Sequence, residues 1–383
     1  MEKGSEKNDY KIFEVIPVMK RKQPKIAIMT IVNSNKVPNW GSKLQNYALQ
    51  TILERMGCKV CTINDARLGY NTYSFKDHWK DLAHYITRYH YRAWEHGKRV
   101  RCLLWIHRHL HYTKEVMHKD EDFGSLVPQY DFFLAGSDQI WNPTFTWYSN
   151  KEAFLQFAKP EQKLCYAPSI GVSEIDFPEE RASEYKEWLK DFQYLSCREI
   201  EGSKIIHKLT GKTVQTLLDP TLLLTTRDWD KLSCNIFPRR RYILFYPLAE
   251  ITEEYRQYVE RLSGRLDMPI VQIKWEDWHS ALSPSEFIRY IKGAAYVVTD
   301  SFHGTVFSML YHKPITYVQS CDVMQQTSTR LHSLLNLAAI KVDFTQRIIP
   351  FPSINWAIFE DNLNQQRKVS FTYLKQIIHN YNE

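Results

Sequence analysis

We base the fold prediction on the stretch Ala294–His312, AAYVVTDSFHGTVFSMLYH. Its beginning, Ala294–Val298, is a short β-branched apolar run that is typical of a buried strand. Its end, Thr305–Leu310, has apolar residues that can fall on one helical face, and the polar turn TDSFHG stands between the two parts. A buried strand that ends in such a turn and continues as a helix is typical of the ligand-binding corner of a doubly wound α/β unit.

The polar turn before this helix predicts an anion site. The first backbone N–H groups of a helix have no partner within the helix and lie at the positive end of its dipole. Ser301, His303 and Thr305 would add side-chain donors, and Gly304 would let a ligand approach the backbone. The alternative is that Asp300 or Ser301 only caps the helix. Capping explains one polar residue but not the neighbouring histidine and glycine, so we favour a ligand site.

Length and composition limit the class of protein. The chain has 383 residues, which is too long for one hydrophobic core and predicts two domains. A net charge of +7 suits anionic substrates or an anionic membrane surface, and it gives little support for nucleic acid as a partner. Seven scattered cysteines predict reduced thiols in a cytoplasmic protein. No stretch reaches the ~18 consecutive apolar residues of a membrane span.

Alternating strand and helix patterns divide the chain into two α/β halves. A polar tail at 1–23 precedes a first domain at 24–225, and the charged, aperiodic segment Thr225–Arg240 leads into a second domain at 241–345. A C-terminal helix within 354–383 is expected to cross back to the first domain. Polar residues follow strands in both halves, which predicts two Rossmann-like domains facing a central cleft, with catalytic groups from both. No G-x-G-x-x-G follows the first strand, so a dinucleotide is not indicated.

A basic, aromatic and histidine-rich region at about 73–119 is predicted to form a helical insertion in the first domain. One interpretation is a helix lying on an anionic membrane surface. The other, slightly favoured, is a solvated basic face over a packed apolar stripe. The histidines of this region lack a metal-binding pattern with a carboxylate, so no metal site is expected. The basic residues are Arg88, Arg92, Lys98, Arg99, Arg101, Arg108 and Lys114.

Five segments, in order, resemble the motifs of the polysaccharide pyruvyl transferase family. They are Asn39–Leu49 (NWGSKLQNYAL), Gly136–Asn142 (GSDQIWN), Ser196–Glu199 (SCRE), Leu218–Thr221 (LDPT) and Thr299–Thr305 (TDSFHGT). Five ordered motifs are a specific signal, whereas each alone would be weak. Trp40 stands where the family more often has tyrosine. The resemblance covers roughly Lys25 to Leu337 and implies a fold like that of the two-domain, GT-B-like glycosyltransferases.

The resemblance also implies an activity. It is the transfer of pyruvate from phosphoenolpyruvate to a saccharide as a ketal, with release of phosphate, during synthesis of cell-surface polysaccharides. Phosphoenolpyruvate is then a substrate, and no cofactor is expected. A lipid-linked acceptor would fit a cytoplasmic protein with peripheral contact to the inner face of an anionic membrane. Two rival functions stay open: a GT-B-type glycosyltransferase using a nucleotide-sugar donor, and a non-catalytic saccharide- or anion-binding protein.

Donor binding is predicted for a cluster of cations and hydrogen-bond donors. Arg198 and Arg330 are the best guanidinium candidates, because arginine pairs with phosphate or carboxylate in a planar, bidentate way. The alternative for Arg198 is a structural ion pair with Glu199 or Glu201, and the alternative for Arg330 is a solvated helix end. With them we place Ser301, His303, Gly304 and Thr305.

The reaction also needs a general acid, a base and an acceptor surface. His303 suits the role of general acid or of anion binder, because histidine titrates near neutral pH. Asp138 and Asp300 follow strands and are candidate bases, with capping an equal alternative for Asp300. For the acceptor we predict amides that bind hydroxyls and a ring that faces a sugar. The acceptor candidates are Asn39, Gly41, Gln45, Ser137, Gln139, Trp141 and Asn142.

Overall fold

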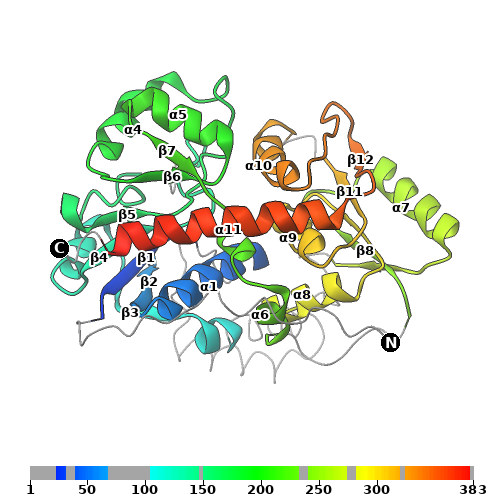
Figure 1. Ribbon diagram of the computed structural model, residues 1–383, viewed down its shortest axis with the longest axis horizontal. Helices are drawn as coiled ribbons and strands as arrows, with labels where there is room; N and C mark the ends of the chain where they lie inside the picture. The colour runs from blue at the N-terminus through cyan, green and yellow to red at the C-terminus, as the bar shows by residue number, and fades with distance from the viewer. Residues whose placement is uncertain are drawn as a thin grey trace, which may run out of the picture.

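The computed structural model describes residues 23–31, 39–67, 104–145, 150–232, 240–273, 282–319 and 324–379, without the side chains of 324–328 and 379. The tail at 1–22, most of the basic region and residues 233–239 between the domains therefore lie outside the described residues. The described elements form two α/β domains side by side, with one long helix across both (Figure 1). No helix in the described ranges is long and apolar enough to cross a membrane.

The first domain contains a five-stranded, fully parallel sheet in the order β3-β2-β1-β4-β5. This is the order of a Rossmann-type half. The central strands are short apolar runs that are buried on both faces, as expected for parallel strands covered by helices. The bounds are β1 Lys25–Met29, α1 Trp40–Arg55, β2 Lys59–Asp65, β3 Tyr112–Met117, η2 Asp120–Leu126, β4 Phe132–Ala135, η3 Pro160–Gln162 and β5 Lys163–Cys165.

A second, two-stranded parallel sheet extends the first domain beyond β5. Its strands are β6 (Leu195–Cys197) and β7 (Val214–Thr216). β6 lies beside the end of β5, since the N–H of Arg198 donates to the carbonyl of Pro168. Arg198 directly follows β6, so it lies at the carboxyl end of β6 and beside the end of β5. The surrounding elements are η4 Glu179–Arg181, α4 Ala182–Leu189, α5 Ile200–Thr210, η5 Pro220–Leu222 and α6 Thr226–Asp230.

The second domain has a sheet in the order β12-β11-β10-β8-β9, parallel except for the edge strand β12. Its central strand is the YVVT of the stretch on which the prediction rests, and the helix expected after it is present. The bounds are β8 Ile243–Tyr246, α7 Glu253–Leu266, β9 Ile270–Gln272, α8 Pro284–Gly293, β10 Tyr296–Thr299, α9 Phe302–Leu310, β11 Ile315–Val318, α10 Met324–Leu337 and β12 Ile348–Pro350.

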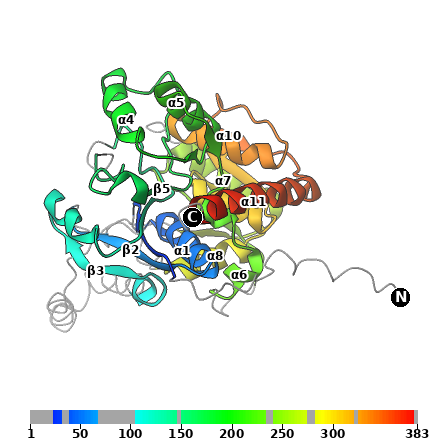
Figure 2. The same cartoon turned by 60° about the vertical axis from the view of Figure 1, so that its left-hand side comes forward.

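The C-terminal helix α11 (Trp356–His379) spans both domains (Figures 1 and 2). At its start, the ring of Trp356 stacks on His312 of the second domain, with centroids 4.6 Å apart. Further along, Arg367 donates to the carbonyl of Leu222 at 2.7 Å, and the hydroxyl of Tyr373 donates to the carbonyl of Cys165 at 3.1 Å. Helix α11 therefore crosses back to the first domain and fastens the two domains to each other.

The domains also share a continuous apolar core. Trp40, at the start of α1, stacks on Phe287 of α8 with ring centroids 5.1 Å apart, and its indole N–H donates to the carbonyl of Leu282 at 2.9 Å. All three residues belong to one buried cluster that contains side chains from both sheets. Burying such aromatic area contributes to holding the two domains together.

The prediction of helices throughout 73–119 is wrong at its end. Residues 104–109 are helical, but Tyr112–Met117 is strand β3 at the edge of the first sheet. An edge strand pairs on one side only, so YTKEVM carries polar residues that hide its strand character. The segment predicted to be aperiodic between the domains likewise contains the short helix α6, which begins with a capping box between Thr225 and Asp228.

Candidate active site

Helix α9 begins at the polar turn as predicted, but the turn residues have structural partners. Ser301 is the N-cap, and its hydroxyl accepts the N–H of Gly304 at 3.1 Å. The hydroxyl of Thr305 donates to the carbonyl of Ser301 at 3.0 Å, and this side chain is fully buried. The capping alternative therefore holds for Ser301. The predicted phosphate-binding role of Thr305 is not supported, because its hydroxyl hydrogen is used inside the helix.

Gly304 has a packing role in place of the predicted contact with a ligand. A Cβ at this position would lie 2.8 Å from Oγ1 of Thr299 and 3.2 Å from Cδ1 of Tyr246. Both neighbours belong to strands of the same sheet. Glycine is needed here because the first turn of α9 lies directly against the strands.

Asp300 holds a loop. Its two carboxylate oxygens accept the N–H groups of Leu248 and Ala249 at 2.6 and 2.8 Å. Burial raises the pKa of Asp300 to about 6, even though these two hydrogen bonds favour the ionised form. With both oxygens bound to the loop after β8, the predicted role of Asp300 as a base is not supported, and Ser301, not Asp300, caps the helix.

His303 lies between the two domains. A Cβ on Gly41, at the start of α1, would come within 2.1 Å of its Nδ1, so only glycine leaves room for the ring. Its Nε2 lies 3.4 Å from Oδ2 of Asp219. The imidazole is 7% exposed. The first turns of α1 and α9 thus meet at this ring. Gly41 packs against the imidazole and does not make the predicted contact with an acceptor.

Asp219 is the functional candidate that the sequence analysis missed. Its Oδ2 accepts a hydrogen bond from Nη1 of Arg198 at 2.7 Å and lies 3.4 Å from the hydroxyl of Ser137. Its Oδ1 accepts the N–H of Thr221 at 2.9 Å. Burial alone would raise the pKa of Asp219, but His303 and Arg198 hold it well below its usual range. The signal in the sequence was the Asp-Pro directly after a strand, within the fourth motif.

Arg198 and Arg330 lie over one aromatic ring. Their guanidinium carbons are 4.7 and 5.5 Å from the centroid of Phe302, and the two residues are 4% and 8% exposed. Arg330 is therefore not the solvated helix end of the alternative. Burial, and then the charge of Arg198, lower the pKa of Arg330 to about 10, so it stays protonated at neutral pH. Nη2 of Arg198 has no hydrogen-bond partner within the described ranges.

The alternative pairing of Arg198 with Glu199 is weak in the structure. The closest approach is 4.0 Å, between Nε and Oε2. Oε1 of Glu199 instead accepts from the hydroxyl of Ser169 and from the N–H groups of Ile170 and Gly171 at 2.7–3.0 Å. Glu199 therefore shapes the loop after β5, while Asp219 is the main partner of Arg198.

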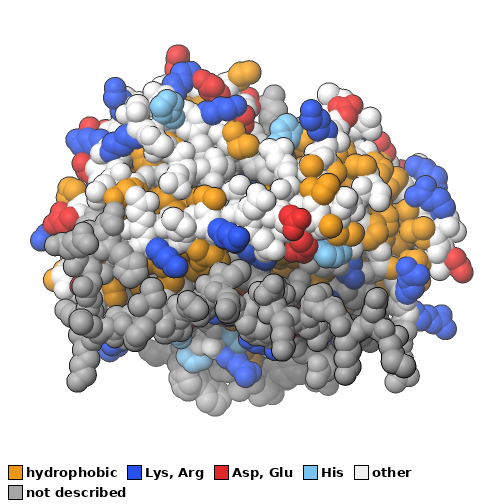
Figure 3. Space-filling model, viewed as in Figure 1, with side chains coloured by type: hydrophobic (Ala, Val, Ile, Leu, Met, Phe, Trp, Pro, Cys, Tyr) orange, Lys and Arg blue, Asp and Glu red, His pale blue; other side chains and the backbone are white. Residues whose placement is uncertain are grey.

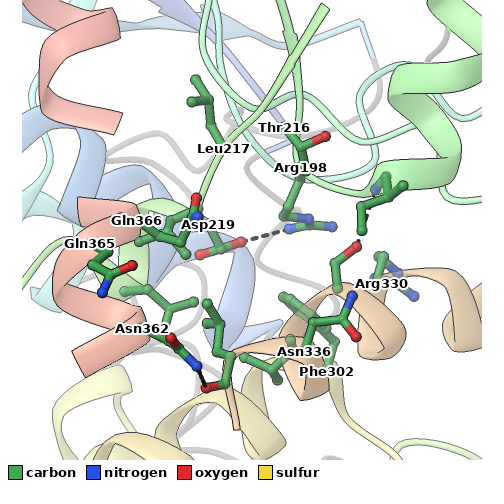
Figure 4. A pocket seen from close by; sticks show the side chains of 16 residues that line it. Arg198, Thr216, Leu217, Asp219, Phe302, Arg330, Asn336, Asn362, Gln365 and Gln366 are labelled. Atoms are coloured by element: carbon green, nitrogen blue, oxygen red, sulfur yellow. Dashed lines mark hydrogen bonds and ion pairs between the residues drawn. The ribbon is translucent and has the colours of Figure 1, made fainter. Parts of the chain in front are cut away.

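These groups open onto a cavity of about 410 Å³ between α5, α10 and α11 (Figure 4). Arg198, Asp219, Phe302 and Arg330 form its charged end. His303 is not one of the lining residues, so its contact with Asp219 connects it to the cavity. The remaining lining residues are Ile200, Thr216, Leu217, Leu218, Leu222, Ser333, Leu334, Asn336, Leu337, Asn362, Gln365 and Gln366.

A sequence model described as polysaccharide pyruvyl transferase matches residues 39–320, which includes all five motifs and the charged end of this cavity except Arg330. The chain belongs to the polysaccharide pyruvyl transferase family. The family is one of transferases, and its description implies a polysaccharide acceptor. No curated protein sequence matches the chain.

Solved structures resemble this pyruvyl transferase family member only distantly. A UDP complex of MnaA from S. aureus is 11% identical, with a TM-score of 0.45 and 90% of each chain covered. A UDP-GlcNAc 2-epimerase from Methanocaldococcus jannaschii is 12% identical, with a TM-score of 0.42, 91% of this chain and 100% of the other covered. The glycosyltransferase SnogD from Streptomyces nogalater is 10% identical, with a TM-score of 0.38 and coverage of 93% and 99%. The fold is α/β, with two Rossmann-like domains.

The predicted acceptor surface after β4 is mostly internal. The ring of Trp141 is fully buried, stacks on Phe154 with centroids 5.0 Å apart, and donates to the carbonyl of Ala153. It offers no face to a sugar, so that prediction is wrong. Asn142 donates to Oε1 of Gln139 at 2.7 Å, and the two amides support each other.

The remaining first-domain candidates also have internal partners. Asn39 is the N-cap of α1 and accepts the N–H of Ser42 at 3.1 Å. Gln45 is fully buried and donates to Oγ1 of Thr30 at 3.0 Å. Ser137 is buried beside Asp219. None of the seven predicted acceptor residues lines the cavity.

Asp138 stands close to the two arginines without pairing with either in the described contacts. It has a φ of +76°, and its Oδ1 accepts the N–H of Gln139 at 2.8 Å. Its charge raises the pKa of Arg198 and of Arg330, an effect that acts against burial. Asp138 thus adds a negative charge near the charged end of the cavity, and its catalytic role stays a prediction.

Proposed function

We propose that this protein transfers a pyruvyl group from phosphoenolpyruvate to two hydroxyls of a saccharide and releases phosphate. The observation that carries the proposal is the pair of buried guanidiniums at the charged end of the cavity, Arg198 from the first domain and Arg330 from the second. Phosphoenolpyruvate carries a phosphate and a carboxylate, both attached to its central carbon. Two arginines at one cavity end match two anionic groups, and their planar forks suit both.

The proposed reaction conserves its atoms as follows. The methylene carbon of phosphoenolpyruvate gains a proton and becomes the methyl group. One saccharide hydroxyl bonds to the central carbon, the bond from that carbon to the phosphate oxygen breaks, and the second hydroxyl closes the ketal. Two hydroxyl protons are lost overall, and they balance the proton on the methyl group and the proton taken up by phosphate.

The pair Asp219–His303 is our proposed route for the proton. Asp219 reaches the cavity wall, and His303 stands behind it at 3.4 Å. A histidine suits proton transfer near neutral pH. The carboxylate stays ionised, because His303 and Arg198 hold its pKa well below its usual range. It keeps Arg198 in place through the 2.7 Å contact, so in our proposal Asp219 serves donor binding and holds the imidazole that carries the proton.

The test is an assay of both products. The purified protein is incubated with phosphoenolpyruvate and a panel of oligosaccharides, free and lipid-linked. We expect phosphate release that depends on the saccharide, together with a mass gain of one pyruvyl ketal on it. Phosphate release without any modified saccharide, or turnover of a nucleotide-sugar donor with release of the nucleotide, would overturn the proposal.

A further inference from the structure

The cavity has two chemically different ends. Every charged residue that lines it, Arg198, Asp219 and Arg330, is buried at one end. The other end carries uncharged amides. They come from three residues of α11, and a fourth amide, Asn336 on α10, is drawn beside Arg330 and Phe302 (Figure 4). The four side chains are exposed or half-buried. A ligand that occupied the whole cavity would therefore be anionic at one end and uncharged at the other.

The three amides of α11 share one face of that helix. They are Asn362, Gln365 and Gln366, which are spaced i, i+3 and i+4. Figure 4 shows them together on the side of the cavity opposite Arg330. Asn362 is held in place, because its amide donates to the carbonyl of Leu337 at 3.0 Å. The amides of Gln365 and Gln366 make no hydrogen bond with other described side chains or backbone groups, which leaves them available to a ligand.

The helix itself is fixed firmly enough to present a binding face. Arg367 and Ser370, on the side turned to the first domain, bond to the backbone of Leu222 and Leu218 at 2.7 and 3.3 Å. Leu218 directly precedes Asp219. The same helix therefore sets the amide face and the strand end that carries the charged end of the cavity, and the distance between the two is built into the fold.

We propose that the amide face of α11, formed by Asn362, Gln365 and Gln366, binds the acceptor saccharide, with Asn336 of α10 as a further amide of the same cavity. The inference rests on the proposed function and names its acceptor site. Side-chain amides both donate and accept hydrogen bonds, as sugar hydroxyls do. A second phosphate or a nucleotide would call for cations at this end, and among the described residues that line it there are none. The acceptor residue next to the donor is accordingly a neutral sugar.

Space and access agree with this assignment. The cavity of about 410 Å³ falls within the roughly 300–1,000 Å³ of small-molecule sites, enough for a small donor and one sugar ring. On the face that α11 crosses, the surface between the two domains above this helix carries mainly polar, uncharged groups, whereas many lysines and arginines lie toward the outer parts (Figure 3). The rest of an oligosaccharide would leave the cavity across that uncharged surface.

The site lies outside the part of the chain that the family model matches. That match ends at residue 320, and all four amides follow it. The family match therefore predicts nothing about these residues. In our account they select the acceptor, while the matched part supplies most of the donor site.

The experiment measures saccharide binding without phosphoenolpyruvate, so that its outcome is separate from that of the transfer assay. The probe is an array of synthetic neutral hexose and N-acetylhexosamine oligosaccharides. The wild-type protein is compared with the double variant Gln365→Ala/Gln366→Ala and with Gln376→Ala. Gln376 is the matched control, because it lies on α11 but does not line the cavity. Thermal unfolding of each protein checks that the fold is kept.

We expect the wild type and Gln376→Ala to bind at least one neutral oligosaccharide, and the double variant to bind it at least tenfold more weakly. With that saccharide as acceptor, the double variant should raise the acceptor KM by a similar factor and leave the KM for phosphoenolpyruvate within twofold. Equal binding by the double variant, or no binding of any neutral saccharide by the wild type, would overturn the inference. Failure of pyruvyl transfer together with amide-dependent binding would instead reject the proposed function alone.

Discussion

The carboxylate of Asp219 in the first domain lies 3.4 Å from Nε2 of His303 in the second domain. The same carboxylate bonds to Arg198 at 2.7 Å, and the other edge of the imidazole faces the backbone of Gly41. Residues of four of the five motifs, which are far apart in sequence, therefore meet around one buried contact between the domains. The charged end of the cavity depends on this contact, because it orients the guanidinium of Arg198.

The variant Asp219→Asn should have a lower free energy of unfolding than the wild type and no turnover. Two buried cationic or protonatable groups would lose their carboxylate, and breaking a buried ion pair on one side costs about 3 kcal/mol. Because the pKa of Asp219 is lowered on folding, its ionised form stabilises the protein above about pH 4, the range in which the unfolded carboxyl titrates. That stabilisation is lost as pH falls toward the lower pKa of the folded state.

Urea unfolding of the wild type and of Asp219→Asn between pH 7 and pH 3 measures this effect. The difference in the free energy of unfolding should be largest at neutral pH and should shrink as the solution becomes more acidic than about pH 4. A difference that is absent at pH 7, or that does not change over this range, would contradict the assigned ion pair.

Substituting Gly41 by alanine should displace the imidazole. The added Cβ would lie 2.1 Å from Nδ1 and 2.5 Å from Cγ of His303, so the ring must move away from Asp219. We expect turnover to fall at least tenfold and stability to fall by about 1–3 kcal/mol, as in other overpacked sites. The control is Gly264→Ala on α7, where no described atom outside the helix's own backbone lies within 4 Å of the added carbon. That variant should keep full turnover. Steady-state kinetics with thermal unfolding checks both, and unchanged turnover in Gly41→Ala would refute the role of this contact.

Asp300→Asn separates a structural role from a catalytic one. The carboxylate binds the loop after β8, so we expect turnover to stay within about threefold of the wild type. Its pKa of about 6 is higher in the folded than in the unfolded protein. The folded state then binds the proton more tightly, and the wild type should lose stability relative to the variant as pH rises from about 4 to about 6.

Thermal unfolding of wild type and Asp300→Asn at pH 4, 5, 6 and 7 follows this trend, and product assays run in parallel follow turnover. A loss of turnover by orders of magnitude in a stable variant would restore Asp300 as the base. A stability difference with the opposite dependence on pH would contradict its burial in the ionised form.

Much of the fold could be predicted because buried parallel strands appear in the sequence as short apolar runs. KIAIM, FFLA, ILFY and YVVT are short, mostly apolar runs, as expected of parallel strands covered by helices. Strand β3 could not be found in this way, since YTKEVM pairs on one side and its pattern of burial is mixed. The strand order and the return of α11 depend on contacts between distant residues, which no local pattern reports.

The candidate site was predicted in part, for a physical reason. Arg198 directly follows a strand, His303 stands in the first turn of a helix after a strand, and Arg330 lies on helix α10. Their residue types and these places made them candidates from the sequence. Polar residues with small side chains were misread, because hydroxyls and amides also bond to their own backbone, as Thr305 and Asn39 do. Trp141 stands next to amide residues in the sequence, a pattern that suggested a ring for binding a sugar. A large indole also fills a hydrophobic core, and that is its role here.

The pair of arginines carries the central claim, and calorimetric titration of phosphoenolpyruvate into the protein tests it most directly. Arg330 stays protonated at neutral pH and faces the cavity with Arg198, so Arg330→Ala should lose a charged hydrogen-bond partner of the donor. The control is Arg256→Ala, which removes a surface guanidinium that is 59% exposed. We predict that the wild type and Arg256→Ala bind phosphoenolpyruvate equally and that Arg330→Ala binds it at least tenfold more weakly. Absence of binding by the wild type, or unchanged binding by Arg330→Ala, would contradict the account.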